Sequence, residues 1–221
     1  DQRLRGKACK WVFENETDVY EWNKEAGNPH KAAAERVKQF PEHCIWKEST
    51  PVREDSHNCH EYEKSNKEDW WVWCPHCNAP QILRFFPPAE GEQPHGYVDG
   101  YKDENGQLLE PEEAEAKAFY RCVKGCKIWQ HEKNLMIKGG IWLPKGQYID
   151  EDGEIQGKAI RSERHSGFYI WTIMQSKISI GRIAAKYIEC LHDGDLRNFI
   201  QDWLGNRFTE KKKVPKYDEV A

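Results

Sequence analysis

Two pairs of cysteines are the residues whose spacing points most directly to chemistry. Cys74 and Cys77 are separated by two residues, and Cys122 and Cys126 by three. Each pair can form a short turn that aims two thiolates at one point, which is what a tetrahedral zinc ion requires. The spacing predicts a zinc ribbon whose Zn²⁺ is structural and closed to substrate. The 44 residues between the pairs exceed ordinary ribbon spacing, so we expect an insertion far from the metal.

Other readings of the cysteines and histidines stay open at this point. The two pairs could be redox-active or simply buried thiols, and His57, Cys59 and His60 form a rival ligand set just upstream. The remaining thiols lie beside apolar residues and are predicted to be buried: Cys9, Cys44 and Cys190. Six histidines occur singly, so solvent-facing or structural roles are expected of them: His30, His43, His95, His131, His165 and His192.

An acidic cluster follows the first apolar run of the chain. Residues 14–18 read Glu-Asn-Glu-Thr-Asp, directly after the predicted buried strand at 11–13. In P-loop nucleotide hydrolases a strand delivers an acid that holds Mg²⁺, with a neighbouring glutamate that positions water. Acid-rich loops are also common without catalysis. No Gly-x-x-x-x-Gly-Lys-Ser/Thr segment occurs in the 221 residues, so the usual phosphate cradle is missing from this sequence.

The surrounding elements follow from local patterns. Asn28-Pro29 is a good helix start and Pro41 a stop, which places a helix between two short strands, an α/β arrangement. Strands are predicted at 70–73 and 81–86, a polar insertion with a short helix at 87–118, and a hairpin at Asp152-Gly153. Two amphipathic helices are predicted for the last third, at 180–191 and 196–204.

Composition restricts the classes of function. The net charge is −4 and the pI about 6.2, the wrong sign for a protein that coats nucleic acid by bulk electrostatics. No apolar window reaches the length of a membrane span, and no secretion leader is visible. We therefore expect no membrane association, a cytoplasmic location, and any DNA contact to be local.

Several segments, taken in order, resemble the terminase large subunit of lambda-like phages. Asn15-Glu16-Thr17-Asp18-Val19-Tyr20, after Leu4-Arg5-Gly6-Lys7, resembles the approach to the family's Walker B acids. Later landmarks follow in the family's order: Gly27-Asn28-Pro29, Glu35-Arg36, Ser49-Thr50-Pro51, Cys74-Pro75-His76-Cys77-Asn78, Tyr120-Arg121-Cys122, Gly139-Gly140-Ile141-Trp142, 166–170 and 194–206. No single match is specific for the family. The occurrence of all of them in the family's order, over nearly the whole chain, is specific.

The resemblance implies an α/β fold and a division into three parts. Residues 1–66 would be the C-terminal half of a P-loop ATPase domain, from Walker B onward. Residues 67–143 would be the zinc ribbon, and 144–221 a hairpin and helices leading to an absent nuclease domain. The full-length family member would be an ATPase and endonuclease that translocates viral DNA and cuts concatemers. This chain, without Walker A and nuclease acids, would neither bind ATP tightly nor cut DNA.

The resemblance also implies residue roles and partners. Glu16 would polarise the attacking water, Asn15 stands where a Mg²⁺-binding Asp is expected, and Asp18 completes the acidic set. An amide is a poorer ligand for Mg²⁺ than a carboxylate. Ser49, Thr50 and Pro51 would couple loss of the γ-phosphate to the motor. Partners would be double-stranded viral DNA, the terminase small subunit, the portal or procapsid, and further copies of the chain, in the host cytoplasm.

A second hypothesis comes from a different class. A stand-alone zinc-ribbon module could bind nucleic acid or a protein through Trp70, Trp71, Trp73 and Arg84, helped by the basic tail 211–213. Aromatic side chains beside basic ones can stack on single-stranded bases. This hypothesis leaves the collinear landmarks unexplained.

Overall fold

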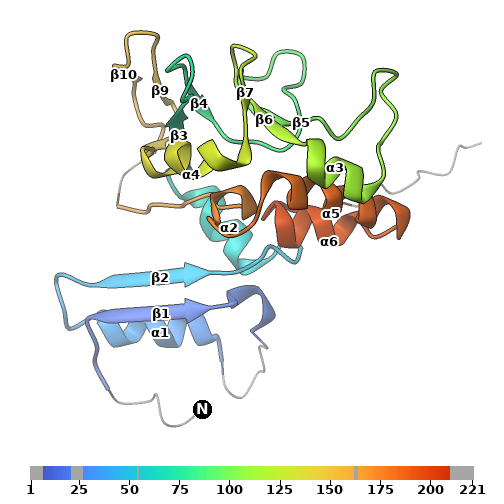
Figure 1. The fold of residues 1–221 in the computed structure, drawn as a ribbon. Coiled ribbons are helices and arrows are strands. Elements are labelled where there is room, and N and C mark those ends of the chain that lie inside the picture. Colours follow the sequence, from blue (N-terminus) through green and yellow to red (C-terminus); the bar gives the residue numbers. More distant parts are fainter. Residues whose placement is uncertain (1–6, 21–26, 54, 162–163, 210–221) are drawn as a thin grey trace, which may run out of the picture.

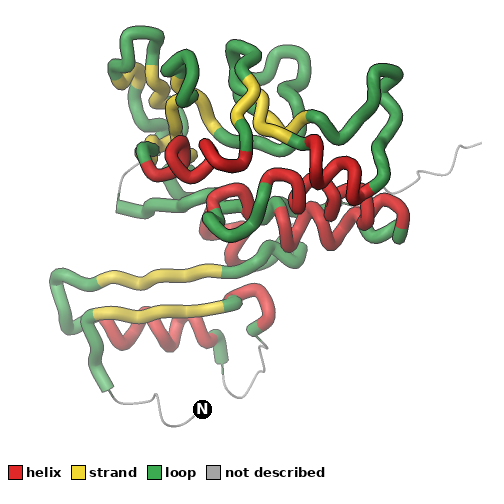
Figure 2. The backbone as a smooth tube through the Cα atoms, in the orientation of Figure 1, coloured by secondary structure: helices red, strands yellow, loops and turns green. Residues whose placement is uncertain are grey.

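The computed structural model describes residues 7–20, 27–53, 55–161 and 164–209 (Figure 1). Residues 4–6 of the first landmark and the basic tail 211–213 lie outside them. The described chain is a mixed α/β structure whose strands form four small sheets, as the tube in Figure 2 shows. None of the helices in these ranges is both long enough and apolar enough for a bilayer span.

The first layer is a strand, a helix and a second strand. β1 (Trp11–Asn15) pairs in parallel with β2 (Cys44–Glu48), and α1 (Pro29–Val37) connects them (Figure 1). α1 begins as predicted, because the Asn28 side chain accepts hydrogen bonds from the backbone N–H groups of His30 and Lys31. Parallel strands need such a crossover, so the predicted helix between two strands is confirmed.

The burial of the side chains on the two faces of this strand pair differs from the prediction. The apolar run at the start of β1 was predicted to be buried, but Trp11 is 61% exposed and Phe13 74%, whereas Glu14 is only 4% exposed. Successive side chains of a strand point to opposite faces, so burying Glu14 turns Phe13 outward. Phe13 is in register with Trp46, which is 39% exposed. The outer face of the pair is therefore apolar; it is largely exposed at Trp11 and Phe13, whereas Trp46 stacks on Phe168.

A helix that local patterns did not indicate, α2 (His57–Lys64), leads to the second part of the chain. There β3 (Glu68–Trp73) lies between β4 (Pro80–Ile82) and β8 (Ile141–Pro144) in an antiparallel sheet. β4 is shorter than the predicted strand at 81–86. A second sheet contains β5 (Tyr97–Asp99), β6 (Phe119–Arg121) and β7 (Lys127–Ile128). α4 (Gln130–Lys138) follows β7.

The predicted hairpin and C-terminal helices are present. β9 (Gln147–Ile149) and β10 (Ile155–Gly157) flank the turn at Asp152-Gly153. Two short 3₁₀ turns lie at Thr17–Val19 (η2) and Thr172–Met174 (η3). α5 (Ile180–His192) is the long amphipathic helix. The second predicted helix is regular only over α6 (Leu196–Asn198) and continues as the π-helical turn Phe199–Trp203 (η4).

The main core joins the small sheets to these helices. It contains Val72, Leu83 and Tyr120 from the sheet region and Ile183 and Ile188 from α5. The segment 87–118, predicted as a polar insertion, also contributes to it through four buried residues: Val98, Tyr101, Ala114 and Ala118. Its helix α3 (Pro111–Lys117) lies against α5 (Figure 1). The proposed domain boundaries stay a prediction.

Gly181 permits the close approach of α3 and α5, and this gives a test of the packing. A Cβ at Gly181 would lie 1.9 Å from the backbone oxygen of Glu115. Alanine favours a helix by up to about 1 kcal/mol over glycine, but overpacking costs about 1–3 kcal/mol or more. We expect Gly181→Ala to lower the free energy of unfolding by roughly 1–2 kcal/mol in urea denaturation.

The matched control is Gly139→Ala at the end of α4. There the nearest atom to a new Cβ is 4.0 Å away, and the backbone is not left-handed. We expect its stability to change little. Equal stability of the two variants would show that α3 does not contact α5 at Gly181.

Candidate functional site

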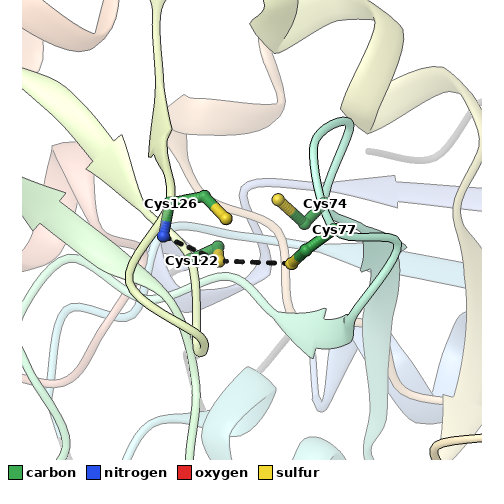
Figure 3. A group of neighbouring side chains, drawn as sticks. All are labelled: Cys74, Cys77, Cys122 and Cys126. Carbon is green, nitrogen blue, oxygen red and sulfur yellow. Dashed lines mark hydrogen bonds between the residues drawn. The ribbon is translucent and has the colours of Figure 1, made fainter.

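The four paired cysteines meet at the tips of two hairpins. Cys74 and Cys77 lie in the turn between β3 and β4, and Cys122 and Cys126 in the turn between β6 and β7 (Figure 3). All four sulfur atoms lie within 4.8 Å of one another. The Sγ atoms of Cys77 and Cys122 are 3.8 Å apart. Tetrahedral zinc with Zn–S bonds of about 2.3 Å separates its sulfurs by about 3.8 Å. The predicted set is thus brought together at ligand spacing.

The backbone conformation of both turns helps to direct the cysteine side chains toward this centre. Asn78, directly after Cys77, has φ 55°, and Gly125, directly before Cys126, has φ 89°. Each turn therefore contains a left-handed residue next to its second cysteine. The N–H groups of Lys124 and Cys126 approach Cys122 Sγ at 3.3 and 3.2 Å. Such donors stabilise a thiolate, which is the form that binds a metal.

Two of the four thiols, Cys74 and Cys126, resist ionisation without a cation. Burial raises the pKa of Cys74 to about 12, and the hydrogen bond with Cys122 raises the pKa of Cys126 to about 11. A bound divalent ion removes this penalty by supplying positive charge. Cys74 and Cys122 are almost fully buried, so the arrangement fits a structural ion with no open coordination position.

The predicted catalytic loop and coupling segment lie side by side at the carboxyl ends of β1 and β2. Asn15, the last residue of β1, is in register with Glu48, the last residue of β2. Because the strands are parallel, the two loops that follow leave the sheet at the same edge. Ser49 Oγ donates to Glu16 Oε2 at 3.4 Å and accepts from the Asp18 N–H at 3.1 Å. Glu16 has a left-handed backbone, with φ 53°. A single hydroxyl therefore connects the acidic loop to Ser49-Thr50-Pro51.

Asp18 also contacts the start of α2. Its Oδ1 accepts from the backbone N–H of Asn58 at 2.7 Å, and Asn58 Nδ2 donates to the Ser49 carbonyl at 3.1 Å. An anion at a helix N-terminus is favourable because it satisfies a free N–H group. Asp18 thus positions α2 in this structure, which is a structural contact for a residue predicted to be catalytic.

The coupling segment also contacts the C-terminal region. Gln201 Nε2, in η4, donates to the backbone oxygens of Pro51 and Val52 at 2.9 and 2.8 Å. Between the two regions lies an open cleft of about 1360 Å³. Its lining includes Glu16, Arg164 and Arg207, so it carries charges of both signs beside the acidic loop. Sequence spacing gave no indication of this long-range contact.

The aromatic residues of the alternative hypothesis are engaged in internal packing. Trp71 is 6% exposed, and Trp70 Nε1 donates to the carbonyl of Ile137 at 3.2 Å. Arg84 pairs with Asp69 at 2.7 Å and lies over the ring of Tyr169. Base stacking would need these groups free on the surface. The geometry therefore favours a core role for them.

The structure distinguishes between the roles predicted for the single histidines and thiols. Of the two roles predicted for His30, solvent-facing or structural, the structure favours the structural one, because His30 is 5% exposed and its Nδ1 lies 3.2 Å from Glu14 Oε2. The His30 and His57 rings stack with centroids 3.5 Å apart. Among the cysteines predicted to be buried, Cys190 is buried, whereas Cys9 and Cys44 are half-buried.

The rival ligand set is not assembled in the described residues. His57 gathers with Glu14 and His30, and not with Cys59 and His60. Cys59 is two positions from His57 and one from His60 on α2, and residues so spaced on a helix do not face each other, which separates Cys59 from both histidines. Burial, with neighbouring His30 and Lys47, lowers the pKa of His57 to about 4. No local spacing could have indicated this cluster, because its members come from β1, α1 and α2.

Comparison with known proteins identifies the family. Residues 1–142 match the family model described as phage terminase large subunit gpA, ATPase domain. No curated protein and no solved structure matches the chain. The match covers more than half of the sequence and includes the acidic loop, the Ser-Thr-Pro segment and all four clustered cysteines. The chain therefore belongs to the ATPase-domain family of the phage terminase large subunit.

Proposed function

We propose that the chain is part of a DNA-packaging terminase of the lambda type. In the complete protein, ATP hydrolysis would drive duplex DNA into a procapsid, and a nuclease activity would cut concatemers. The observation that carries this proposal is the hydroxyl of Ser49 between Glu16 and Asp18, at the edge where two parallel strands end. This edge is where α/β proteins place their ligands.

The residue roles that the family resemblance implies are compatible with this placement. Glu16 would hold and polarise the attacking water, and Asn15 would lie at the Mg²⁺ position beside it. Mg²⁺ would neutralise phosphate charge when bound. The donor set fits it only in part, because Asn15 supplies an amide where a carboxylate binds better. When Glu16 moves, its hydrogen bond with Ser49 would displace Thr50 and Pro51. The hydrogen bonds of Gln201 to Pro51 and Val52 would transmit that displacement to the C-terminal helices.

The open face of the β1–β2 pair supports completion by another polypeptide segment. Two-stranded sheets are marginal alone, and parallel sheets are normally covered on both faces. Trp11 and Phe13 are largely exposed on this apolar face, and Trp46 on the same face is 39% exposed and stacks on Phe168. A further α/β layer that carries the Gly-x-x-x-x-Gly-Lys-Ser/Thr segment would cover it, so residues 1–66 would be part of an ATPase domain.

The four cysteines would hold a structural Zn²⁺ that organises residues 67–143. The region 144–221 would lead toward a nuclease domain. Duplex DNA, the small subunit, the portal or procapsid and further copies of the chain would be the partners, in the host cytoplasm. Because the net charge of the chain is −4, the chain as a whole would not attract DNA, and contact with DNA would be made by local parts of the surface in the assembled motor.

The zinc proposal is tested by Cys122→Ser. Cys122 is buried and receives two N–H groups, so its loss should leave a three-thiol site that holds zinc poorly. We expect bound zinc, measured by elemental mass spectrometry of the reduced chain, to fall from about one per chain to well below that. Thermal stability should fall as well, because structural zinc contributes folding free energy.

Cys9→Ser is the matched control, since Cys9 is half-buried and outside the cluster. It should keep both zinc and stability. Unchanged zinc content and melting temperature in Cys122→Ser would contradict the metal site.

The ATPase proposal is tested by complementation. The chain is combined with a polypeptide that carries a Walker A half of the same family, and ATP hydrolysis is measured. We expect activity that Glu16→Gln lowers on the order of 100-fold or more, as for loss of a general base. Asn15→Asp should raise turnover because a carboxylate restores the Mg²⁺ ligand. Failure of every Walker A half to restore hydrolysis would contradict the enzyme proposal.

The control for this experiment is Glu42→Gln. Glu42 is exposed and pairs only with Lys10 among the ion pairs of the described residues. Its removal should leave turnover unchanged. If Asn15→Asp also leaves turnover unchanged, Asn15 does not occupy the Mg²⁺ position.

A further inference from the structure

A second group of metal-ligand residues lies on the other face of the β1–β2 pair. Glu14 comes from β1, His30 from the first turn of α1 and His57 from the first residue of α2. One ligand atom from each lies within 4.8 Å of the others. Glu14 and His30 are 4% and 5% exposed, and His57 is half-buried, which leaves an approach from solvent. None of the three takes part in the proposed zinc or ATPase chemistry.

The donors have the composition of a transition-metal site. Two imidazoles and one carboxylate suit Zn²⁺, Mn²⁺, Fe²⁺, Co²⁺ or Ni²⁺, whereas Mg²⁺ and Ca²⁺ prefer oxygen ligands alone. Metal–ligand bonds of about 2.0–2.2 Å place ligand atoms about 3.3–3.6 Å apart. The His30 Nδ1 to Glu14 Oε2 distance of 3.2 Å is close to that value. The stacked rings need only tilt apart for their nitrogens to converge on one ion.

The local charge favours a dication. Three carboxylates, Glu14, Glu61 and Asp18, act on this region, against the ammonium groups of Lys47 and Lys64, both of which pair with Glu61. Lys47 Nζ lies 3.8 Å from Glu14 Oε2 and 3.0 Å from His57 Nε2, so it is the cation beside the ligands in the metal-free form. It also lies 3.4 Å from Glu61 Oε2. Lys47 can therefore move toward Glu61 and leave space for an ion.

We propose that Glu14, His30 and His57 form a second metal site, with the chemical preference of a first-row transition ion such as Zn²⁺. The ion would fasten the starts of α1 and α2 to the end of β1. Because strand side chains alternate, it would lie on the face opposite the Asn15 side chain and apart from the proposed nucleotide site. Its role is to fix the strand end that immediately precedes Asn15 and Glu16.

The test is the metal stoichiometry of the full chain. Wild-type and variant proteins are equilibrated with increasing Zn²⁺, freed of unbound metal on a desalting column, and assayed by elemental mass spectrometry. The wild type should bind a second equivalent beyond that of the four cysteines. Glu14→Gln and His57→Ala should weaken the second equivalent at least about tenfold and retain the first. Lys47→Met should tighten the second equivalent, because it removes the competing ammonium group.

His60→Ala is the matched control, because His60 is also on α2 but lies outside the cluster. It should bind both equivalents. Retention of the first equivalent shows that each variant is folded around its cysteines, so the two sites are judged separately. A wild type that binds only one equivalent at excess Zn²⁺, or a Glu14→Gln variant that binds the second as tightly as wild type, would overturn the proposal.

Discussion

The parallel register of β1 with β2 is the constraint on which the candidate ATPase region depends. Register places Asn15 opposite Glu48, so that the acidic loop and the Ser-Thr-Pro segment leave the sheet at one edge. Side-chain alternation then assigns the faces: Phe13 and Trp46 turn outward, and Glu14 and Lys47 turn inward beneath α1. A shift of one residue would exchange these faces and break the contact of Ser49 with Glu16.

The second half of the chain depends on a different interaction. Its sheets consist of strands as short as two residues, and short strands hold together weakly unless something fixes them. Four thiols at two hairpin tips supply a point where β3–β4 and β6–β7 meet (Figure 3). The same core then extends to α3 and α5. Closing the hairpins at their tips therefore orders residues that are distant in the sequence.

The two halves are connected by a few specific contacts near the candidate nucleotide edge. Trp46 stacks on Phe168 with centroids 6.0 Å apart, Asn58 holds the Ser49 carbonyl, and Gln201 holds the carbonyls that follow it. The Ser-Thr-Pro segment is thus bonded at one end to the acidic loop and at the other to the C-terminal helices. In the proposed motor, these bonds would connect the site of hydrolysis to the C-terminal helices.

Local signals in the sequence were sufficient to predict several features. Asn28-Pro29 starts α1, the apolar spacing of 180–191 produces α5, and the paired cysteines assemble because each turn positions two sulfurs. Collinear motifs also identified the family that the comparison confirmed. Three outcomes were visible only in the folded chain: Trp11 and Phe13 face outward, 87–118 joins the core, and Glu14 lies beside His30 and His57. Those outcomes depend on contacts between distant segments, for which neither periodicity nor spacing carries a signal.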